Sequence, residues 1–332
     1  MTVAVLDVEC AGYAVVQDLG RPGFAGLGIA VNGALDQNAA RTANILVGNA
    51  EGAPLIEVTG SDLTLRARTG VLIAVTGAAG VVLIDGHRQP SWETLYAHAG
   101  SRIVIPNPAV GFRSYFAVSG EIAAERVLGS VAPDPLLGAG RRLFDGDRVQ
   151  LRAMRPIVPR DELGALFRMG AARTPLRGRA AIDVTEGPDL DRLAVGGRAL
   201  DAVWRVLPQS DHVGMRLDGP AIAQTSMAEI ASRGVPIGAV EVPPAGGVIV
   251  LLRGRLVTAG YPVVAVVTTL SLDTLAQVRP GDEVSMSFSD RDSAVRGARQ
   301  QADGRAALAR RVQRAFHAKG IAPAPVLPEL AC

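Results

Sequence analysis

The chain has 332 residues, 48% of them hydrophobic and only 4% aromatic, so its cores are expected to consist of Val, Leu, Ile and Ala. At about 150 residues per domain, this length predicts two domains. The formal net charge of +2 argues against nucleic acid as the main partner.

Lysine is almost absent from the chain. The single lysine, Lys319, lies close to the C-terminus. A Walker A loop requires Gly-Lys-Ser/Thr, and Schiff-base chemistry requires a lysine amine. We therefore expect no covalently held cofactor, and we expect any ATP or biotin that serves this chain to be bound by another chain.

Cysteine usage and hydropathy predict a cytoplasmic protein that does not cross a membrane. Cys10 and Cys332 form no disulfide framework, and the N-terminal residues lack the basic region of a signal peptide. The longest apolar run, from Val71 to Ile84, is shorter than the roughly 20 residues of a membrane helix. The four histidines show no metal-ligand spacing, so no metal site is expected.

The most informative stretch runs from Val16 to Asn49, where a strand end leads through a glycine-rich loop into a helix. Loops that collect polar groups between regular elements often build binding sites. The candidate substrate-binding residues of this stretch are Gln17, Asp18, Arg21, Asn32, Asp36 and Asn44. The alternative is that these groups only satisfy backbone, and Asp36 in particular stands where it can N-cap the helix.

After this helix the pattern predicts short strands up to residue 152. Leu63 to Arg68 alternates apolar and polar residues, as a half-buried strand does, and Asp85-Gly86 predicts a type I′ hairpin turn. Frequent turn signals between short strands favour a closed or sandwich-like β architecture.

The rest of the chain is predicted to contain a linker, a second β domain and a helical tail. Residues 153–180 are interpreted as a linker with one short helix at 161–169, and residues 181–289 as a second β domain that repeats the first, whose range is 1–152. For example, Pro280-Gly281-Asp282 parallels Asp145-Gly146-Asp147. Residues 290–332 are expected to be helical, split at Gly304 and ending in a disordered Pro-rich segment.

The second domain adds candidates for chemistry. Asp211 beside His212 is the best acid/base pair by proximity, although adjacent residues of an extended segment point apart. Tyr261 could offer its phenol to a ligand or simply stack at a strand end. Several arginines could clamp a carboxylate or serve only structure, namely Arg21, Arg41, Arg113, Arg216 and Arg253.

Several blocks of sequence occur in an order that resembles the allophanate hydrolase subunit 2 family, also called the 5-oxoprolinase C subunit or Kip antagonist, which corresponds to subdomains A and B of the biotin-dependent carboxyltransferase domain. The blocks are QDLGRPG, NGALDQNAARTANILVGN, Gly111–Gly120, Ser210–Leu217 and Thr258–Pro262. The resemblance extends over roughly residues 10 to 288.

This resemblance implies a mainly β fold of two cyclophilin-like β-barrel domains with a few short helices and a C-terminal helical tail. It implies a companion, allophanate hydrolase subunit 1 or the 5-oxoprolinase B subunit, and in some cases a third subunit. The implied activity is ATP-driven opening of 5-oxoproline to glutamate, or an allophanate hydrolase-like reaction on a small amide or lactam. Asp211 and His212 would then be catalytic, and Arg216 and Tyr261 would join the loop residues in substrate binding. Two alternatives remain: a regulatory protein that only sequesters the companion, and a stand-alone module that binds a peptide.

The sequence departs from the family pattern at several positions. Asn32 stands where the family usually has Ser, and His212 where it usually has Arg. Gly254 and Leu256 replace an acid and an amide. These departures bear on the substrate and on whether this chain is active, but not on the predicted fold.

Overall fold

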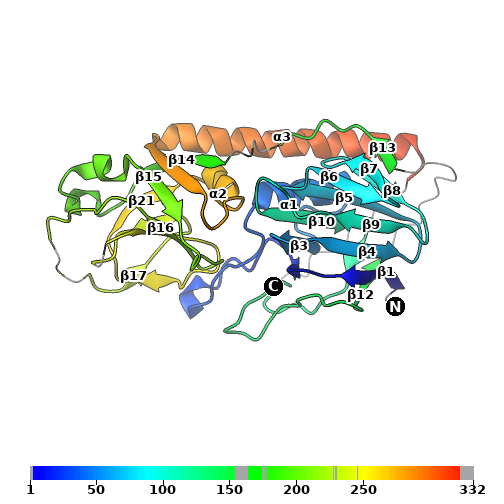
Figure 1. Cartoon of the computed structure of the whole chain (residues 1–332), viewed down its shortest axis with the longest axis horizontal. Coiled ribbons are helices and arrows are strands. Elements are labelled where there is room, and N and C mark those ends of the chain that lie inside the picture. Colours follow the sequence, from blue (N-terminus) through cyan, green and yellow to red (C-terminus); the bar gives the residue numbers. More distant parts are fainter. Residues whose placement is uncertain are drawn as a thin grey trace.

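The computed structural model describes residues 3–153, 164–173, 176, 178–226, 228, 230–244 and 246–321. They form two β-rich halves, and a long helix runs along one side of both (Figure 1). The predicted mainly β fold with short helices and a C-terminal helix is confirmed.

The strands of the first half are divided between two antiparallel sheets. They are β1 Val3–Cys10, β2 Ala14–Gln17, β3 Leu55–Thr59, β4 Leu63–Ala67, β5 Val71–Gly77, β6 Val81–Ile84, β7 His87–Pro90, β8 Thr94–Ala97, β9 Arg102–Ile105, β10 Arg113–Val118, β11 Glu121–Ile122, β12 Arg148–Ala153 and β13 Gly164–Phe167. A seven-stranded sheet has the order β11-β12-β1-β4-β9-β6-β7, and a six-stranded sheet has the order β13-β8-β5-β10-β3-β2.

Alternating side chains explain how these sheets pack. In β10, Phe116 and Val118 point into the core between the two sheets, whereas Tyr115 and Ala117 point to the opposite face, where helices cover them. The six-stranded sheet is therefore buried on both faces. The predicted hairpin turn joins β6 to β7, and Asp85 and Gly86 have φ angles of 50° and 80°, as a type I′ turn requires.

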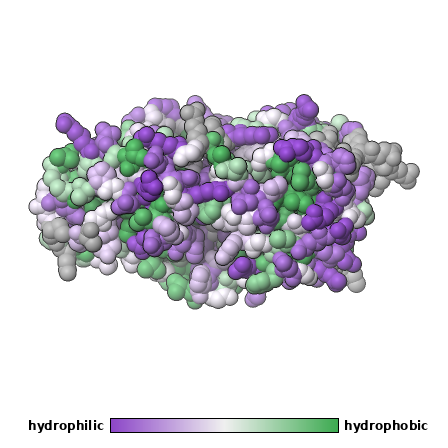
Figure 2. Space-filling view, viewed as in Figure 1, coloured by the Kyte–Doolittle hydropathy of each residue, from purple (hydrophilic) through white to green (hydrophobic). Residues whose placement is uncertain are grey.

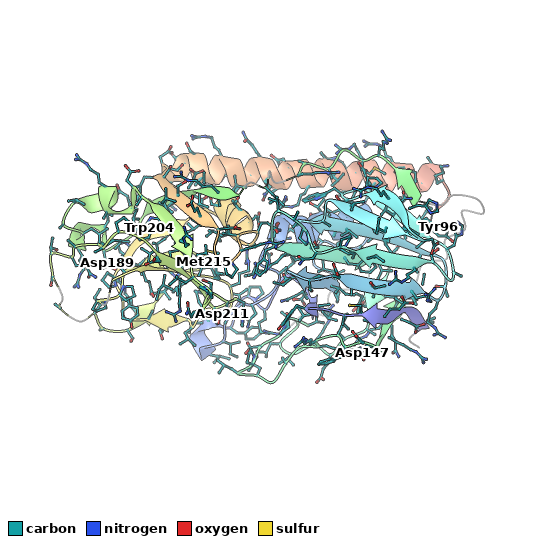
Figure 3. The ribbon with its side chains drawn as sticks, in the orientation of Figure 1. Tyr96, Asp147, Asp189, Trp204, Asp211 and Met215 are labelled. Atoms are coloured by element: carbon teal, nitrogen blue, oxygen red, sulfur yellow. The ribbon has the colours of Figure 1, made fainter. Side chains whose placement is uncertain are left out.

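The second half is a closed barrel with the strand order β14-β21-β18-β19-β16-β15-β22. Its strands are β14 Arg179–Glu186, β15 Val203–Val206, β16 Gly214–Asp218, β18 Ala239–Glu241, β19 Val248–Leu251, β21 Val263–Val267 and β22 Glu283–Phe288. The parallel pair of β14 and β22 closes the barrel around a core that includes Trp204 and Met215 (Figure 3). A separate two-stranded sheet pairs β17 Arg233–Gly234 with β20 Thr258–Ala259.

The helices pack on both halves of the molecule, and α3 contacts each of them. The α-helices are α1 Gln37–Leu46, α2 Thr269–Leu275 and α3 Arg291–Ala318, and the 3-10 helices are η1 Ala25–Leu27, η2 Leu190–Arg192 and η3 Gly196–Leu200. Helix α1 and the C-terminal part of α3 cover the outer face of the six-stranded sheet, where Leu308, Val312 and Phe316 of α3 are buried. The N-terminal part of α3 packs against α2 of the second half.

Two local predictions were wrong. The helix predicted at 161–169 is not formed where it is described, because Gly164–Phe167 is strand β13, which completes the open edge of β8. Helix α3 is continuous through Gly304, because its apolar face has a surface to pack on along the first half. The predicted disordered segment after residue 321 lies outside the described residues.

One turn in each half has the same pattern of hydrogen bonds, whereas the predicted internal duplication as a whole stays a prediction. In the first half Gly146 N–H donates to Val8 O at 2.8 Å, and Asp147 Oδ2 accepts from Phe144 N–H at 3.0 Å. In the second half Gly281 N–H donates to Val206 O at 2.8 Å, and Asp282 Oδ2 accepts from Arg279 N–H at 2.9 Å. The same type of turn thus precedes β12 in the first half and β22 in the second.

None of the helices in the described ranges is both long and apolar enough to cross a bilayer. Figure 2 shows hydrophilic and hydrophobic side chains interspersed over the visible face of both halves.

Candidate functional site

The loop between β2 and α1 is fastened to the segment at 126–134 by buried polar groups. Asp18 accepts hydrogen bonds from Ser130 Oγ at 2.6 Å, from Val131 N–H at 2.8 Å and from Gly20 N–H at 2.8 Å. A carboxylate with this many hydrogen-bond donors is committed to the fold. Asp18 therefore anchors the loop.

Arg21 has a related structural role. Its side chain is fully buried, and the guanidinium is ion-paired with Asp134 at 3.3 Å and donates to the carbonyls of Val127 and Ala132. Asp134 also accepts from Asn32 Nδ2 at 2.9 Å. Arg21 thus orients Asn32 through a shared carboxylate, and its own donors already have partners inside the fold.

Two further candidates of this stretch, Asn44 and Gln17, have different surroundings. Asn44 lies in α1 and donates to the carbonyls of Ala53 at 2.8 Å and Glu51 at 3.2 Å, which fixes the segment after the helix. Gln17 is buried at the end of β2, and its Oε1 has no hydrogen-bond partner.

Asn32 meets the second half of the molecule. Its φ of 54° lies in the left-handed region, which asparagine tolerates better than most residues. Its N–H donates to Arg253 O at 3.0 Å, and Gly254 N–H donates to His212 O at 2.9 Å. Backbone hydrogen bonds therefore join three segments that are far apart in the sequence.

Their side chains converge on Gly254. A Cβ added to Gly254 would stand 3.0 Å from both His212 Nε2 and Asn32 Oδ1, and it would overlap the imidazole carbon Cδ2. The space that a side chain at 254 would need is therefore occupied by the imidazole of one half and the amide of the other. We call this group, Asn32, His212, Arg253 and Gly254, the seam cluster.

Asp211 supports the loop that carries His212. Its Oδ1 accepts from Val213 N–H at 2.8 Å and from Gly214 N–H at 3.0 Å, which closes a tight turn. Asp211 is exposed, on the side of the barrel nearest the first half (Figure 3). In this arrangement the carboxylate holds the turn, and the imidazole faces Asn32.

Arg216 and Tyr261 are not brought into the seam cluster. Arg216 lies on β16 with an exposed side chain, and Tyr261 is 43% exposed just before β21. Within the described ranges neither side chain makes a hydrogen bond to Asn32 or His212.

Two buried acids lie at the start of α1. Asp36 caps the helix as predicted, with Oδ1 accepting from Ala39 N–H at 2.8 Å, and its Oδ2 accepts from Gln277 Nε2 at 2.7 Å. Asp273 of α2 accepts from Gln37 N–H at 2.9 Å. Burial, and then repulsion from Asp273, raise the pKa of Asp36 to about 8, and burial raises the pKa of Asp273.

Arg253 interacts electrostatically with these acids, since Asp273 and, more weakly, Asp36 favour its charged form. Its Nε is buried without a hydrogen-bond partner, and burial lowers the pKa of the guanidinium. Sequence reasoning included Arg253 among five possible clamps but missed Asp273 and Gln277. No local signal links those two residues to Asp36, which lies 241 positions before Gln277.

No group of three or more His, Cys, Asp or Glu side chains in the described part of the chain is arranged to hold a metal ion. The seam cluster offers instead an imidazole and an amide side by side, and the backbone of Arg253, which carries a guanidinium, is hydrogen-bonded to Asn32. These groups can donate and accept hydrogen bonds, transfer a proton and bind an anion.

Comparison with known proteins gives a consistent set of relatives. The family model described as Carboxyltransferase domain, subdomain A and B, matches residues 27–288. The 5-oxoprolinase C subunit of Escherichia coli (strain K12) is 34% identical over 306 residues, which is 90% of this chain and 95% of that protein. The 5-oxoprolinase C subunit of Haemophilus influenzae is 32% identical over 291 residues, 85% of this chain and 89% of that protein.

Solved structures are also similar to this chain over most of its length. The crystal structure of TTHA0988 superposes with a TM-score of 0.77 at 34% identity, covering 86% of this chain. This chain spans only 55% of that one, so it matches little more than half of its length. The K. lactis urea amidolyase has a TM-score of 0.83 at 22% identity, covering 93% of this chain and 20% of that chain, and it supports the fold.

Proposed function

Because the chain belongs to the carboxyltransferase domain family of subdomains A and B, we propose that it is one subunit of an ATP-dependent complex that processes an amide or lactam bond. The substrate proposed first is 5-oxoproline, opened to glutamate, since two relatives that match most of the chain are named as the C subunit of 5-oxoprolinase. An allophanate hydrolase-like reaction is the nearest variant. We propose a cytoplasmic location.

The proposed complex contains a homologue of allophanate hydrolase subunit 1 or of the 5-oxoprolinase B subunit and, for the 5-oxoproline reaction, a third subunit. ATP is bound by another chain, and so is biotin if the reaction uses it. With a single lysine, Lys319 at the C-cap of α3, this chain has no Gly-Lys-Ser/Thr phosphate-binding loop. This chain is proposed to provide part of the wall of the site, with the companion completing it.

One observation carries the assignment of the site: Asn32 from one half and His212 from the other converge on Gly254. We propose that the substrate amide binds against these two side chains. The amide of Asn32, oriented by Asp134, hydrogen-bonds the substrate, and His212 transfers a proton to or from the amide nitrogen. Asp211 positions His212 through its turn. Asp18, Arg21 and Asp36 hold the loop in place around the site.

The test is reconstitution. Co-production with the B-subunit homologue and the third subunit is expected to give ATP-dependent loss of 5-oxoproline with formation of glutamate. In that complex His212→Ala is expected to lower kcat by about 10²- to 10⁴-fold, the usual effect of removing a general acid or base. His87→Ala, at an exposed position on β7, serves as the control and is expected to change nothing. The absence of turnover in the complete mixture would remove the proposal.

A non-catalytic function remains the second candidate. Gly254 and Leu256 stand where the family pattern has an acid and an amide, and Leu256 is 65% exposed. A regulatory protein that binds and antagonises its companion needs no such groups. Tight co-purification with the companion, without turnover in any mixture of the subunits, would favour this candidate.

A further inference from the structure

Arg253 is an unusual arginine in this fold. No ion pair within 4.0 Å and no side-chain hydrogen bond involves it in the described part of the chain, and its Nε is buried without a partner. A guanidinium has five donors in a rigid fork and stays charged at neutral pH. Leaving such a group partly buried and unpaired is costly, which calls for a partner that the isolated chain does not contain.

The other arginines that could clamp a carboxylate differ from Arg253. Arg21 is ion-paired with Asp134, and Arg41 is ion-paired with Glu51 at 3.0 Å. Arg113 donates to Ala276 O at 2.5 Å. Arg216 is exposed on β16. Arg253 alone among the five is partly buried with neither an ion pair nor a side-chain hydrogen bond in the described part of the chain.

The two acids nearest Arg253 in charge interactions, Asp36 and Asp273, make their hydrogen bonds to other groups. Asp36 accepts from Ala39 N–H and Gln277 Nε2, and Asp273 accepts from backbone N–H groups at the start of α1. Burial, and then repulsion from Asp273, raise the pKa of Asp36, and neither acid forms an ion pair with Arg253 within 4.0 Å in the described part of the chain. Arg253 is therefore free to bind an anion from outside.

The backbone of Arg253 is fixed beside the proposed amide site. Its carbonyl accepts from Asn32 N–H at 3.0 Å, and the next residue, Gly254, donates to His212 O at 2.9 Å. Arg253, which carries the guanidinium, thus belongs to the same turn that brings Asn32 and His212 together. A small ligand that contacts those two side chains lies within reach of this turn.

We propose that Arg253 binds the carboxylate of the substrate, so that the seam cluster takes small amide or lactam acids in preference to neutral amides. This inference rests on the proposed function and narrows it. It favours substrates of the 5-oxoproline type, which carry a carboxylate next to the ring N–H, over neutral urea. Bidentate binding of a carboxylate by arginine supplies both affinity and orientation.

The test compares 5-oxoproline with 2-pyrrolidinone, the same lactam ring without the carboxylate, by calorimetric titration of the co-purified complex without ATP. The wild-type complex is expected to bind 5-oxoproline at least tenfold more tightly. Arg253→Met is expected to weaken 5-oxoproline binding about tenfold to hundredfold and to leave 2-pyrrolidinone binding unchanged, as loss of a hydrogen-bonded charge predicts. Arg253→Lys, which keeps the charge but not the fork, is expected to fall between them.

Arg205→Met, which removes an exposed guanidinium of β15, is the matched control and is expected to bind both ligands as the wild type does. The comparison of the two ligands on wild-type protein needs no variant, so a folding defect in Arg253→Met does not block the test. Equal wild-type affinity for both ligands, with 5-oxoproline turnover intact, would overturn the role of Arg253 and leave the proposed function standing. A complex that neither binds nor turns over 5-oxoproline would overturn both.

Discussion

Glu241 lies in β18 on the outer face of the barrel, and only 2% of its surface is exposed. Its register partners are Ile249 and Val263, and its Oε1 has no hydrogen-bond partner. Burial raises its pKa to about 7 from an ordinary value of 4.5. The folded state therefore holds a proton on Glu241 that the unfolded state releases at lower pH.

This difference predicts a pH-dependent effect of Glu241→Gln. Between pH 4.5 and about 7 the unfolded chain binds fewer protons at this position, so stability falls as pH rises, and the penalty is complete above pH 7. Glu241→Gln removes the penalty and is expected to stabilise the protein by roughly 1–3 kcal/mol at pH 8, with little gain at pH 5. Urea unfolding at the two pH values measures it. The exposed Glu186→Gln is the control, and equal gains at both pH values would contradict the explanation.

At the residue scale, sequence predicts what is local and misses what is distant. The N-cap role of Asp36 followed from its place before an apolar helix, and the structure confirms it. The partners of the same carboxyl, Asp273 and Gln277, come from the other half of the chain, where no short motif marks them. Of the candidate site residues, Asn32 and His212 meet, whereas Arg216 and Tyr261 lie apart from them.

At the scale of single elements, the periodic strands were predictable and the mixed segments were not. The alternation of β4 and the Asp85-Gly86 turn are dictated by side-chain pattern and backbone conformation. Strand β13 was mistaken for a helix because its sequence is compatible with both states. The open edge of β8 decides between them by supplying hydrogen-bond partners.

Helix α3 offers a direct test of its continuity. Gly304 lies in the helix interior, and a Cβ added there meets no atom within 4 Å. Gly304→Ala is expected to stabilise the protein by roughly 0.5–1 kcal/mol, because alanine has less backbone freedom to lose. The measurement is the free energy of unfolding in urea.

Gly297 of the same helix is the matched control. A Cβ there would stand 2.8 Å from Leu270 Cδ1 of α2, so Gly297→Ala must displace that side chain and is expected to gain less than Gly304→Ala. Equal effects of the two substitutions, or a loss of stability in Gly304→Ala, would indicate that α3 is not one continuous helix packed on both halves.

At the scale of the whole molecule, the site depends on how the two halves meet. The first half provides Asn32, the second provides His212 and Gly254, and α3 crosses both (Figure 1). The turns at Gly146 and Gly281 share a pattern of hydrogen bonds, but the seam cluster takes different residues from each half. This convergence was beyond prediction from the sequence, because it depends on the packing of one half on the other.

The most direct test of the central claim is to observe His212 while substrate binds. With histidine Cε1 labelled with carbon-13 in the assembled complex, the His212 resonance, assigned by its loss in His212→Gln, is expected to shift as 5-oxoproline is added, while those of His87, His98 and His317 stay in place. An unchanged His212 resonance at a 5-oxoproline concentration that saturates turnover would contradict the claim that the substrate binds where the two halves meet.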